Sequence, residues 1–526
     1  MKQRISFVLA AALVAGLIAG AVPAGAAGSH PVRFDARRYL KQHGYLPLRG
    51  VATLRRAKAH AAAVVAASHP SAAPAASQAA PATPSIGSSW NGTAQSNVSP
   101  PDPNGAVGPN SYVEVVNVKM AIYQRTGSLI ASANFSSLTG NGNGSDPMVL
   151  WDPDTQRFYY NIWNTANARM DWGFSKDSNP TSIPGSWCRY ETAFGYPTTS
   201  FPDYPKLGQT KDFLMLGVNF YPTSSSQEST SSDLLWISKP QGQAPVTTCP
   251  AAGSFTSGKV TGLLNADGSQ AFTPVPAIQT DPSSTGYVLG LSDIECPPRC
   301  GTGTQLTVFT VTNGGGVPAV SAPDSIVVGS YQSPPNAPQK GTTNTLDTLD
   351  GRLTHAVSGL DPTFGTTTVW AGHTVLGGAG SQINWYEVDP AAGAVVHSGA
   401  ASDPSLYVLN AGISNDRTCT ATTCAHGDSM VLGFTTTSAA TRPAVQMVSK
   451  VGAGAQSGFV LVKQSTKSDK GFTCSPCRWG DYGGATPDPA ASLTAAQGEV
   501  WLTNQWTKGG SFATSGDATW NWEARP

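Results

Sequence analysis

The chain has 526 residues, only 12% of which are charged, and its 32 Lys and Arg balance its 32 Asp and Glu to a net charge of zero. Without excess positive charge, nucleic acid is not an expected partner, and there is no electrostatic reason to bind an acidic membrane. The 56 Gly and 40 Pro are typical of a secreted all-β protein with many turns.

Residues 1–27 predict export. A short basic stretch, MKQR, precedes the apolar stretch ISFVLAAALVAGLIAGAV, and small residues follow at Ala24–Ala27. This order is that of a secretory signal peptide. No later stretch approaches the roughly 20 apolar residues that a membrane span needs. We therefore expect a secreted, extracellular protein.

Residues 28–88 differ in composition from the rest of the chain. A basic, helix-compatible stretch ends near VVAAS, and an Ala/Pro/Ser-rich stretch, HPSAAPAASQAAPATPS, follows it. The composition is that of a flexible spacer. A pro-segment or a cell-wall tether is the alternative interpretation.

Residues 89–526 read as repeated strands. A short apolar strand, a turn (Asp-Pro in several units) and a second strand rich in aromatic or β-branched residues recur in DPMVLWDPDTQRFYYNIWN and PVPAIQTDPSSTGYVLGLS. Units of this kind occupy residues 105–130, 146–164, 204–220, 274–292, 352–375, 405–437 and 479–506. Seven blade-sized units favour an all-β fold of the β-propeller type with about seven blades, six or eight being the alternatives. We expect one propeller domain and a monomer.

The eight cysteines are an even number in an oxidising compartment, which favours disulfides. Three pairs are close in sequence, and the two remaining residues would pair with each other. The expected pairs are Cys296–Cys300, Cys419–Cys424, Cys474–Cys477 and Cys188–Cys249.

Three stretches carry a resemblance to known proteins. FPDYPKLG, LDTLDGRL with VWAGHTV and INWYEVDP, and RWGDYGGATPDP with VWLTNQW look like motifs of a family of secreted, largely uncharacterised bacterial propeller-like proteins. The family is distantly allied to sialidase or BNR-type propellers. The resemblance implies the propeller fold and is nearly silent on activity. SKDSNPTSIPGSW lacks the glycine spacing of a sialidase Asp-box, and a third arginine for a sialidase triad is not evident, so we do not expect sialidase activity.

Polar side chains gather at the starts of the repeated units, where the inner strands of a propeller would converge on one face of the channel. Carboxylates there could hydrolyse a glycosidic bond, one as acid and one as nucleophile or base. The candidate catalytic residues are Asp146, Asp203 and Asp481, and the candidate substrate-binding residues are Tyr204, Lys206, Arg352, His355, Arg478 and Tyr482. By contrast, Asp152, Asp281, Asp361, Asp389 and Asp488 are expected to be turn residues.

Three functions fit this pattern. The leading interpretation is a glycoside hydrolase acting on an extracellular polysaccharide or glycan. A non-catalytic propeller that binds glycan or protein at the cell surface is the first alternative. A polysaccharide lyase is the second, with His355 or Tyr482 as base and a cation among Arg352, Arg478 and Lys206 to neutralise a uronate.

Cofactor motifs are absent from the sequence. There is no EF-hand loop, no His-Glu-x-x-His, no nucleophile elbow, and no P-loop or dinucleotide fingerprint. We expect no cofactor, although a structural Ca²⁺ held by channel carboxylates and carbonyls is compatible with the fold.

Overall fold

The structure is a computed structural model that describes residues 51–67, 81–94, 97–223, 228–240, 242–294, 301–474 and 476–526. The expected signal peptide, most of the Ala/Pro-rich stretch and the Cys296–Cys300 pair lie outside these residues. Within them, no helix is long and apolar enough to cross a membrane.

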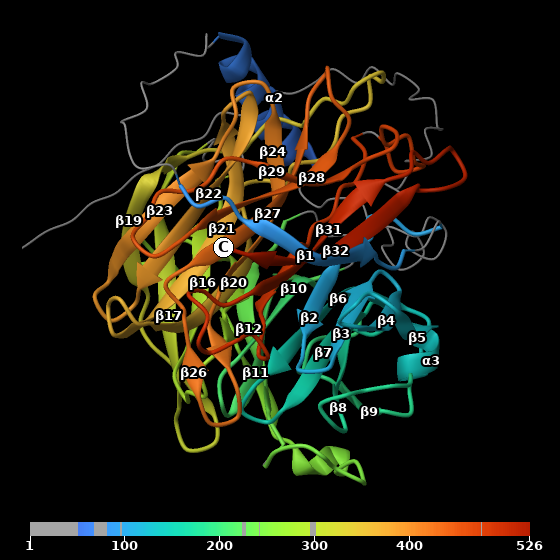
Figure 1. The fold of residues 1–526 in the computed structure, drawn as a ribbon, viewed down its shortest axis with the longest axis vertical. Coiled ribbons are helices and arrows are strands. Elements are labelled where there is room, and N and C mark those ends of the chain that lie inside the picture. The colour runs from blue at the N-terminus through green and yellow to red at the C-terminus, as the bar shows by residue number, and fades with distance from the viewer. Residues whose placement is uncertain are drawn as a thin grey trace, which may run out of the picture. The chain divides into compact units, whose positions relative to one another are not determined.

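Antiparallel sheets repeat along the described chain, and each begins with its innermost strand (Figure 1). The first three blades run from the inside outward through consecutive strands. Blade 1 holds β2(Asn104–Val107), β3(Ser111–Val116), β4(Lys119–Gln124) and β5(Leu129–Asn134). Blade 2 holds β6(Gly144–Asp152), β7(Arg157–Asn164), β8(Arg169–Ser175) and β9(Trp187–Thr192). Blade 3 holds β10(Phe201–Gln209), β11(Phe213–Tyr221), β12(Ser231–Ser238) and β13(Ser257–Val260).

Blades 4 and 5 are each enlarged to five strands. Blade 4 holds β14(Ala271–Pro276), β16(Gly286–Ser292) and β17(Gly303–Asn313), with β18(Pro318–Val320) and β19(Asp324–Tyr331) both paired to β17. Blade 5 holds β20(Leu353–Asp361), β21(Thr366–Gly377), β22(Gly380–Asp389) and β23(Ala394–Ala401), and β15(Ile278–Gln279) adds a short parallel edge to β20.

Blades 6 and 7 complete the set, and blade 7 takes one strand from the other end of the chain. Blade 6 holds β24(Tyr407–Asn415), β27(Met430–Thr437), β28(Ala444–Lys450) and β29(Val460–Gln464), beside the small hairpin of β25(Thr418–Cys419) and β26(Cys424–Ala425). Blade 7 holds β30(Gly484–Pro487), β31(Val500–Thr507) and β32(Asp517–Arg525), and its outer strand is β1(Ser85–Asn91). Figure 1 shows β1, in blue, lying beside β32, in red.

The innermost strands form a closed circle. Strands β2, β6, β10, β14, β20, β24 and β30 each contact the next, and β30 contacts β2 again. The described chain is therefore a seven-bladed β-propeller, which confirms the predicted fold class. Each of the seven sequence units covers the first two strands of one blade.

Burial explains why the sequence shows the inner strands most clearly. Strands β6 and β7 are buried along their whole length, and β7 reads RFYYNIWN, a run of the large side chains that sheets favour. The outer strands β5 and β13 are mostly exposed or half-buried. Adjacent blades pack face to face through apolar clusters, such as the one between blades 1 and 2 that contains Phe135, Trp151 and Trp187.

Within the described residues, a 17-residue helix, a five-residue helix and a 3-10 turn accompany the sheets. Helix α3(Phe135–Thr139) lies between blades 1 and 2, and η1(Ala252–Ser254) lies between β12 and β13. Helix α2(Val51–Ala67) falls inside the segment that composition describes as a spacer, and β1 crosses the expected domain boundary at residue 89.

Three disulfides join described cysteines, and all three match expected pairs. They are Cys188–Cys249, Cys419–Cys424 and Cys474–Cys477. The first links strand β9 of blade 2 to the segment between β12 and β13 of blade 3. These bonds are compatible with an extracellular protein.

Most of the predicted turn aspartates do cap turns. Asp152, Asp361, Asp389 and Asp488 each accept a backbone N–H from two residues farther along the chain. Asp281 makes long-range contacts instead: its carboxylate binds the Arg417 guanidinium, with an Nη2–Oδ1 distance of 2.7 Å, and accepts the Leu360 amide.

Candidate functional site

Backbone outliers mark one end of the inner strands. Non-glycine residues with positive φ stand at or next to the start of five of them: Asp102 (43°), Asp146 (51°), Tyr204 (58°), Thr273 (51°) and Asn410 (62°). In β6, β10, β14 and β24 the pairing register shifts at this point, as at a β-bulge. Such conformations cost on the order of 1–3 kcal/mol each and cluster at functional sites. The bulges re-aim side chains at this end of the inner strands, which we call the channel mouth.

The Asp481 peptide joins three blades at this mouth. Its N–H donates to Asp102 Oδ1 at 2.8 Å, and its carbonyl accepts the Tyr204 hydroxyl at 2.7 Å and the Lys206 ammonium at 3.2 Å. The segment that follows the Cys474–Cys477 disulfide is therefore tied to the first strands of blades 1 and 3.

Lys206 is fully buried between two aromatic rings. Its Nζ lies 3.3 Å from the ring centroid of Tyr482 and 3.9 Å from that of Tyr204. Burial lowers the pKa of Lys206 well below its usual value, while the carboxylates of Asp481, Asp102 and Asp146 oppose that shift. The amine thus stands inside the site rather than on a surface where a substrate carboxylate could pair with it.

Asp146 and Asp203 form an unequal pair of carboxyl groups. Asp146 is buried, and its carboxyl accepts from Ser145 Oγ at 2.7 Å and lies 3.1 Å from the Tyr482 hydroxyl, whereas Asp203 is half-buried. Burial first, then the carboxylates of Asp203 and Asp481, raise the pKa of Asp146 to about 7. The surroundings of Asp146 therefore favour its protonated form.

Neighbouring amides hold Asp146 in place. The Asn117 side-chain oxygen Oδ1 accepts the Asp146 backbone N–H at 2.9 Å, and the Asn117 side-chain nitrogen Nδ2 donates to Asp102 Oδ2 at 2.7 Å. Sequence reasoning passed over Asn117, which lies in the turn between β3 and β4. The repeated X-Pro pairs Asp102-Pro103, Asp146-Pro147 and Tyr204-Pro205 are a signal that could have aligned the bulges.

Both candidate arginines are already paired with carboxylates. Arg352 Nε donates to Asp350 Oδ1 at 2.7 Å and its Nη2 pairs with the other oxygen, while Arg478 binds Asp481 at 2.5 Å and Asp347 at 3.4 Å. Each guanidinium is more than nine-tenths buried. Their charges are balanced within the protein, so neither is free to neutralise a uronate.

His355 is a buried neutral imidazole. Its Nδ1 lies 2.8 Å from the Ile413 carbonyl, which only accepts, so Nδ1 carries the proton and Nε2 presents a lone pair. Nε2 has no hydrogen-bond partner, and burial is the main cause that lowers the pKa of His355 to about 4.

The structure thus places the candidate residues in one region, closely packed, with Asp203 the most exposed of them.

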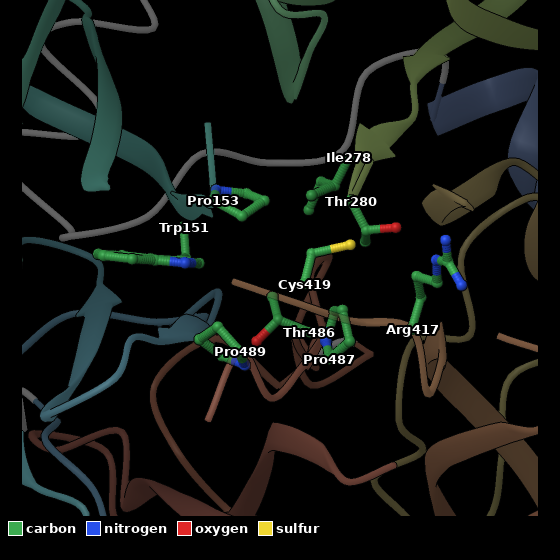
Figure 2. Close-up of a pocket in the computed structure, with 9 residues that line it drawn as sticks. All are labelled: Trp151, Pro153, Ile278, Thr280, Arg417, Cys419, Thr486, Pro487 and Pro489. Atoms are coloured by element: carbon green, nitrogen blue, oxygen red, sulfur yellow. The ribbon is translucent and has the colours of Figure 1, made fainter. Parts of the chain in front are cut away.

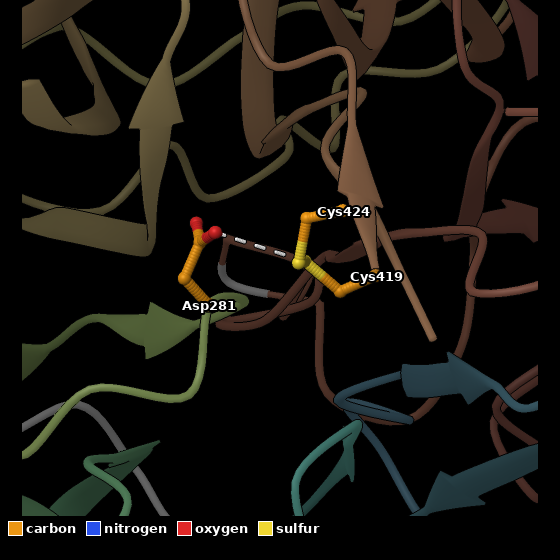
Figure 3. A group of neighbouring side chains, drawn as sticks. All are labelled: Asp281, Cys419 and Cys424. Carbon is orange, nitrogen blue, oxygen red and sulfur yellow. Dashed lines mark hydrogen bonds between the residues drawn. A yellow bond between two sulfur atoms is a disulfide. The ribbon is translucent and has the colours of Figure 1, made fainter. Parts of the chain in front are cut away.

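Two described groups combine carboxylate and sulfur atoms that a metal could use, Asp281 with Cys419 and Cys424, and Asp469 with Cys474 and Cys477. In both, the two sulfurs form a disulfide, so they are not thiolate ligands. Figure 3 shows the first group, where Cys419 Sγ lies 3.8 Å from Asp281 Oδ1. A structural Ca²⁺ stays a prediction.

A pocket with about 310 Å³ of atom-free space lies away from the candidate residues (Figure 2). Its wall is mainly apolar carbon from the far ends of inner strands and the turns after them. The lining residues are Trp151, Pro153, Ile278, Thr280, Arg417, Cys419, Thr486, Pro487 and Pro489. None of the nine predicted site residues lines it.

Comparison with known proteins gives no family. No family model matches the chain, and no curated protein matches it. Among solved structures, the chain is similar to the polysaccharide lyase Uly1, at 10% identity and a TM-score of 0.40 over 82% of this chain and 91% of that one. It is also similar to the Trypanosoma rangeli sialidase in complex with the inhibitor DANA, at 9% identity and a TM-score of 0.35 over 83% of this chain and 60% of that one. A third similar structure is the Dos1 propeller, at 11% identity and a TM-score of 0.33 over 83% of this chain and 94% of that one. Similarities at this level of identity and TM-score do not indicate an activity.

Proposed function

We propose that this protein is an exported glycoside hydrolase that acts as a monomer on an extracellular polysaccharide or glycan. The observation that carries the proposal is the pair of unequal carboxyl groups at the channel mouth. Burial raises the pKa of Asp146 to about 7, and its neighbour Asp203 is more exposed. Glycosidases use two carboxyl groups that stand in different environments and take different roles.

Each residue has a distinct role in this proposal. Asp146 donates its proton to the leaving glycosidic oxygen, and Asp203 acts on the sugar as nucleophile or as the base that activates water. Asp481 does not supply a free carboxylate, because Arg478 binds it. It positions Tyr204 and Lys206 through its backbone carbonyl instead.

The same contacts disfavour a lyase. A lyase that acts on a uronate needs a cation to stabilise the charge that develops on the substrate. Arg352 and Arg478 are each bound by an aspartate, and Lys206 is enclosed by two tyrosine rings. Burial also raises the pKa of Tyr482 well above its usual value, which makes its phenolate a costly base.

The test is hydrolysis of a glycan panel, measured as new reducing ends. Asp146→Asn and Asp203→Asn should each lower the rate by about 10²–10⁴-fold, the contribution of a general acid or base. Asp267→Asn, a change in an exposed turn aspartate, is the control and should leave the rate unchanged. An active enzyme whose rate survives both substitutions would overturn the assignment.

The closed packing of the site favours a second candidate, a non-catalytic glycan-binding propeller. Asp146 is only 8% exposed, and the two rings around Lys206 are at most 3% exposed. Retention on a glycan array, with no new reducing ends or unsaturated products from any glycan that binds, would support binding over hydrolysis.

A further inference from the structure

Helix α2 is attached to the propeller by a narrow face. Among its described side chains, Ala57, Lys58 and Ala61 are buried, whereas Arg55 and Arg56 are exposed. Of these three buried residues, Lys58 is the one whose side chain can form hydrogen bonds and ion pairs with the propeller. This lysine is 7% exposed, an unusual position for an ammonium group unless several acceptors surround it.

The propeller provides those acceptors in one segment between β19 and β20. Lys58 Nζ lies 2.6 Å from Thr348 Oγ1, 2.6 Å from the Leu349 carbonyl, 3.3 Å from the Pro334 carbonyl and 3.6 Å from Asp347 Oδ1. An ammonium has three N–H donors and no acceptor, which this set of oxygens matches.

Contacts within the propeller help to hold this pocket in shape. The Thr348 hydroxyl donates to the Pro335 carbonyl at 3.0 Å, which leaves its lone pairs to accept, and the Leu349 amide donates to Asp347 Oδ1 at 3.1 Å. The Asp347 amide donates to the Cys477 carbonyl at 2.9 Å. These bonds do not involve α2.

The pocket continues into the candidate site. Asp347 Oδ2 lies 3.4 Å from Arg478 Nη1, and Arg478 in turn binds the carboxylate of Asp481. A cation in the pocket therefore helps to balance a buried carboxylate that is shared with the channel mouth. If α2 left, Asp347 would keep only Arg478, which Asp481 also binds, as a charged partner among the ion pairs of the described residues.

We propose that this pocket is a binding site for a primary ammonium group, which α2 fills with Lys58 as an internal stand-in for the ligand. The ligand is the free amino group of an amino-sugar glycan, which enters when α2 is displaced. The choice of a glycan rests on the proposed function, whereas the ammonium specificity rests on the pocket alone.

Chemical rescue tests the pocket in the full-length protein. Lys58→Ala should lower the thermal unfolding midpoint, and methylammonium should restore it, because a small ammonium can take the place of the missing side chain. Tetramethylammonium has the charge but no N–H donor and should not restore it. The exposed Arg56→Ala is the matched control. No response of Lys58→Ala to methylammonium, or an equal response of Arg56→Ala, would overturn the site.

A second substitution separates the pocket from general destabilisation. Thr348→Val, made in the Lys58→Ala protein, removes one acceptor without changing charge. The methylammonium affinity should fall about tenfold, the effect of a single hydrogen bond to a charged group. An unchanged affinity would contradict the assigned geometry.

Calorimetry with soluble oligomers tests the ligand class without any turnover. The Lys58→Ala protein should bind glucosamine oligomers at least about tenfold more tightly than N-acetylglucosamine oligomers, which lack the ammonium. Equal binding, or none of either, would overturn the amino-sugar assignment, even where methylammonium rescue succeeds. Since no bond is broken in this experiment, its outcome is independent of the hydrolysis test.

Discussion

Asp146 keeps a proton in the folded protein at pH values where an exposed aspartate has lost it. Its pKa is about 7 in the fold, against an ordinary value of 3.8. Between these values the folded state binds more protons than the unfolded chain, so the contribution of this group to stability is largest below about pH 4 and is lost as the pH rises toward 7.

The raised pKa of Asp146 predicts a pH dependence of stability that can be tested. In the wild type, the free energy of unfolding should fall as the pH rises toward 7, by at most about 1.4 kcal/mol per pH unit from this group. In Asp146→Asn, this contribution to the fall should be absent. Urea unfolding at pH 4.5 and pH 7 in both proteins, with Asp267→Asn as control, measures the difference. If wild type and Asp146→Asn show the same dependence, Asp146 is not protonated in the fold.

The sequence could indicate which residues gather at the mouth, but not how they are paired. Polar residues at the starts of inner strands converge in any propeller, so Asp146, Tyr204 and Tyr482 could be found from the repeat alone. The burial of the site could not be predicted, because the side chains that balance its charges come from segments outside the repeated units. Asp347 and Asp350 precede β20, and Lys58 lies on α2.

At the scale of elements, the repeat was readable where strands are buried on both faces. The first two strands of each blade are apolar and bounded by turn residues, and these were the units recognised. The short outer strands, such as β18, carry little pattern. Strand β1, SIGSSWN, could not be assigned to blade 7 because its pairing partner lies at the other end of the chain.

Trp90 is the principal apolar anchor of β1. Its ring packs against Tyr112, Tyr123 and Trp501, with centroid distances of 5.6, 5.6 and 5.7 Å, and so joins blade 7 to blade 1. Trp90→Ala should destabilise the protein by roughly 3–5 kcal/mol, the usual cost of emptying a buried aromatic site.

The matched control lies on the same strand. Ile86 is 38% exposed, so Ile86→Ala should cost much less than Trp90→Ala in chemical denaturation. Equal effects of the two substitutions would mean that β1 contributes pairing but no specific packing between the blades.

At the scale of the whole molecule, closure of the ring depends on the two ends of the described chain. The inner strands β30 and β2 contact each other, and β1 completes blade 7 from outside by pairing with β32. A propeller closed in this way has no open sheet edge at the junction of its first and last blades, because the N-terminal strand covers β32.

Two truncations separate this closure from the role of α2. Deletion of residues 1–84 removes α2 but keeps β1, so the propeller should stay folded, with a modest fall in its thermal midpoint from the loss of Lys58.

Deletion of residues 1–91 also removes β1 and Trp90. It uncovers the hydrogen-bonding edge of β32, so the midpoint should fall much further and the protein should associate in a concentration-dependent manner. Calorimetry and light scattering on both proteins measure these effects. Equal midpoints and no association in either truncation would show that β32 does not need its N-terminal partner, and that the contacts between β30 and β2 alone keep the ring closed.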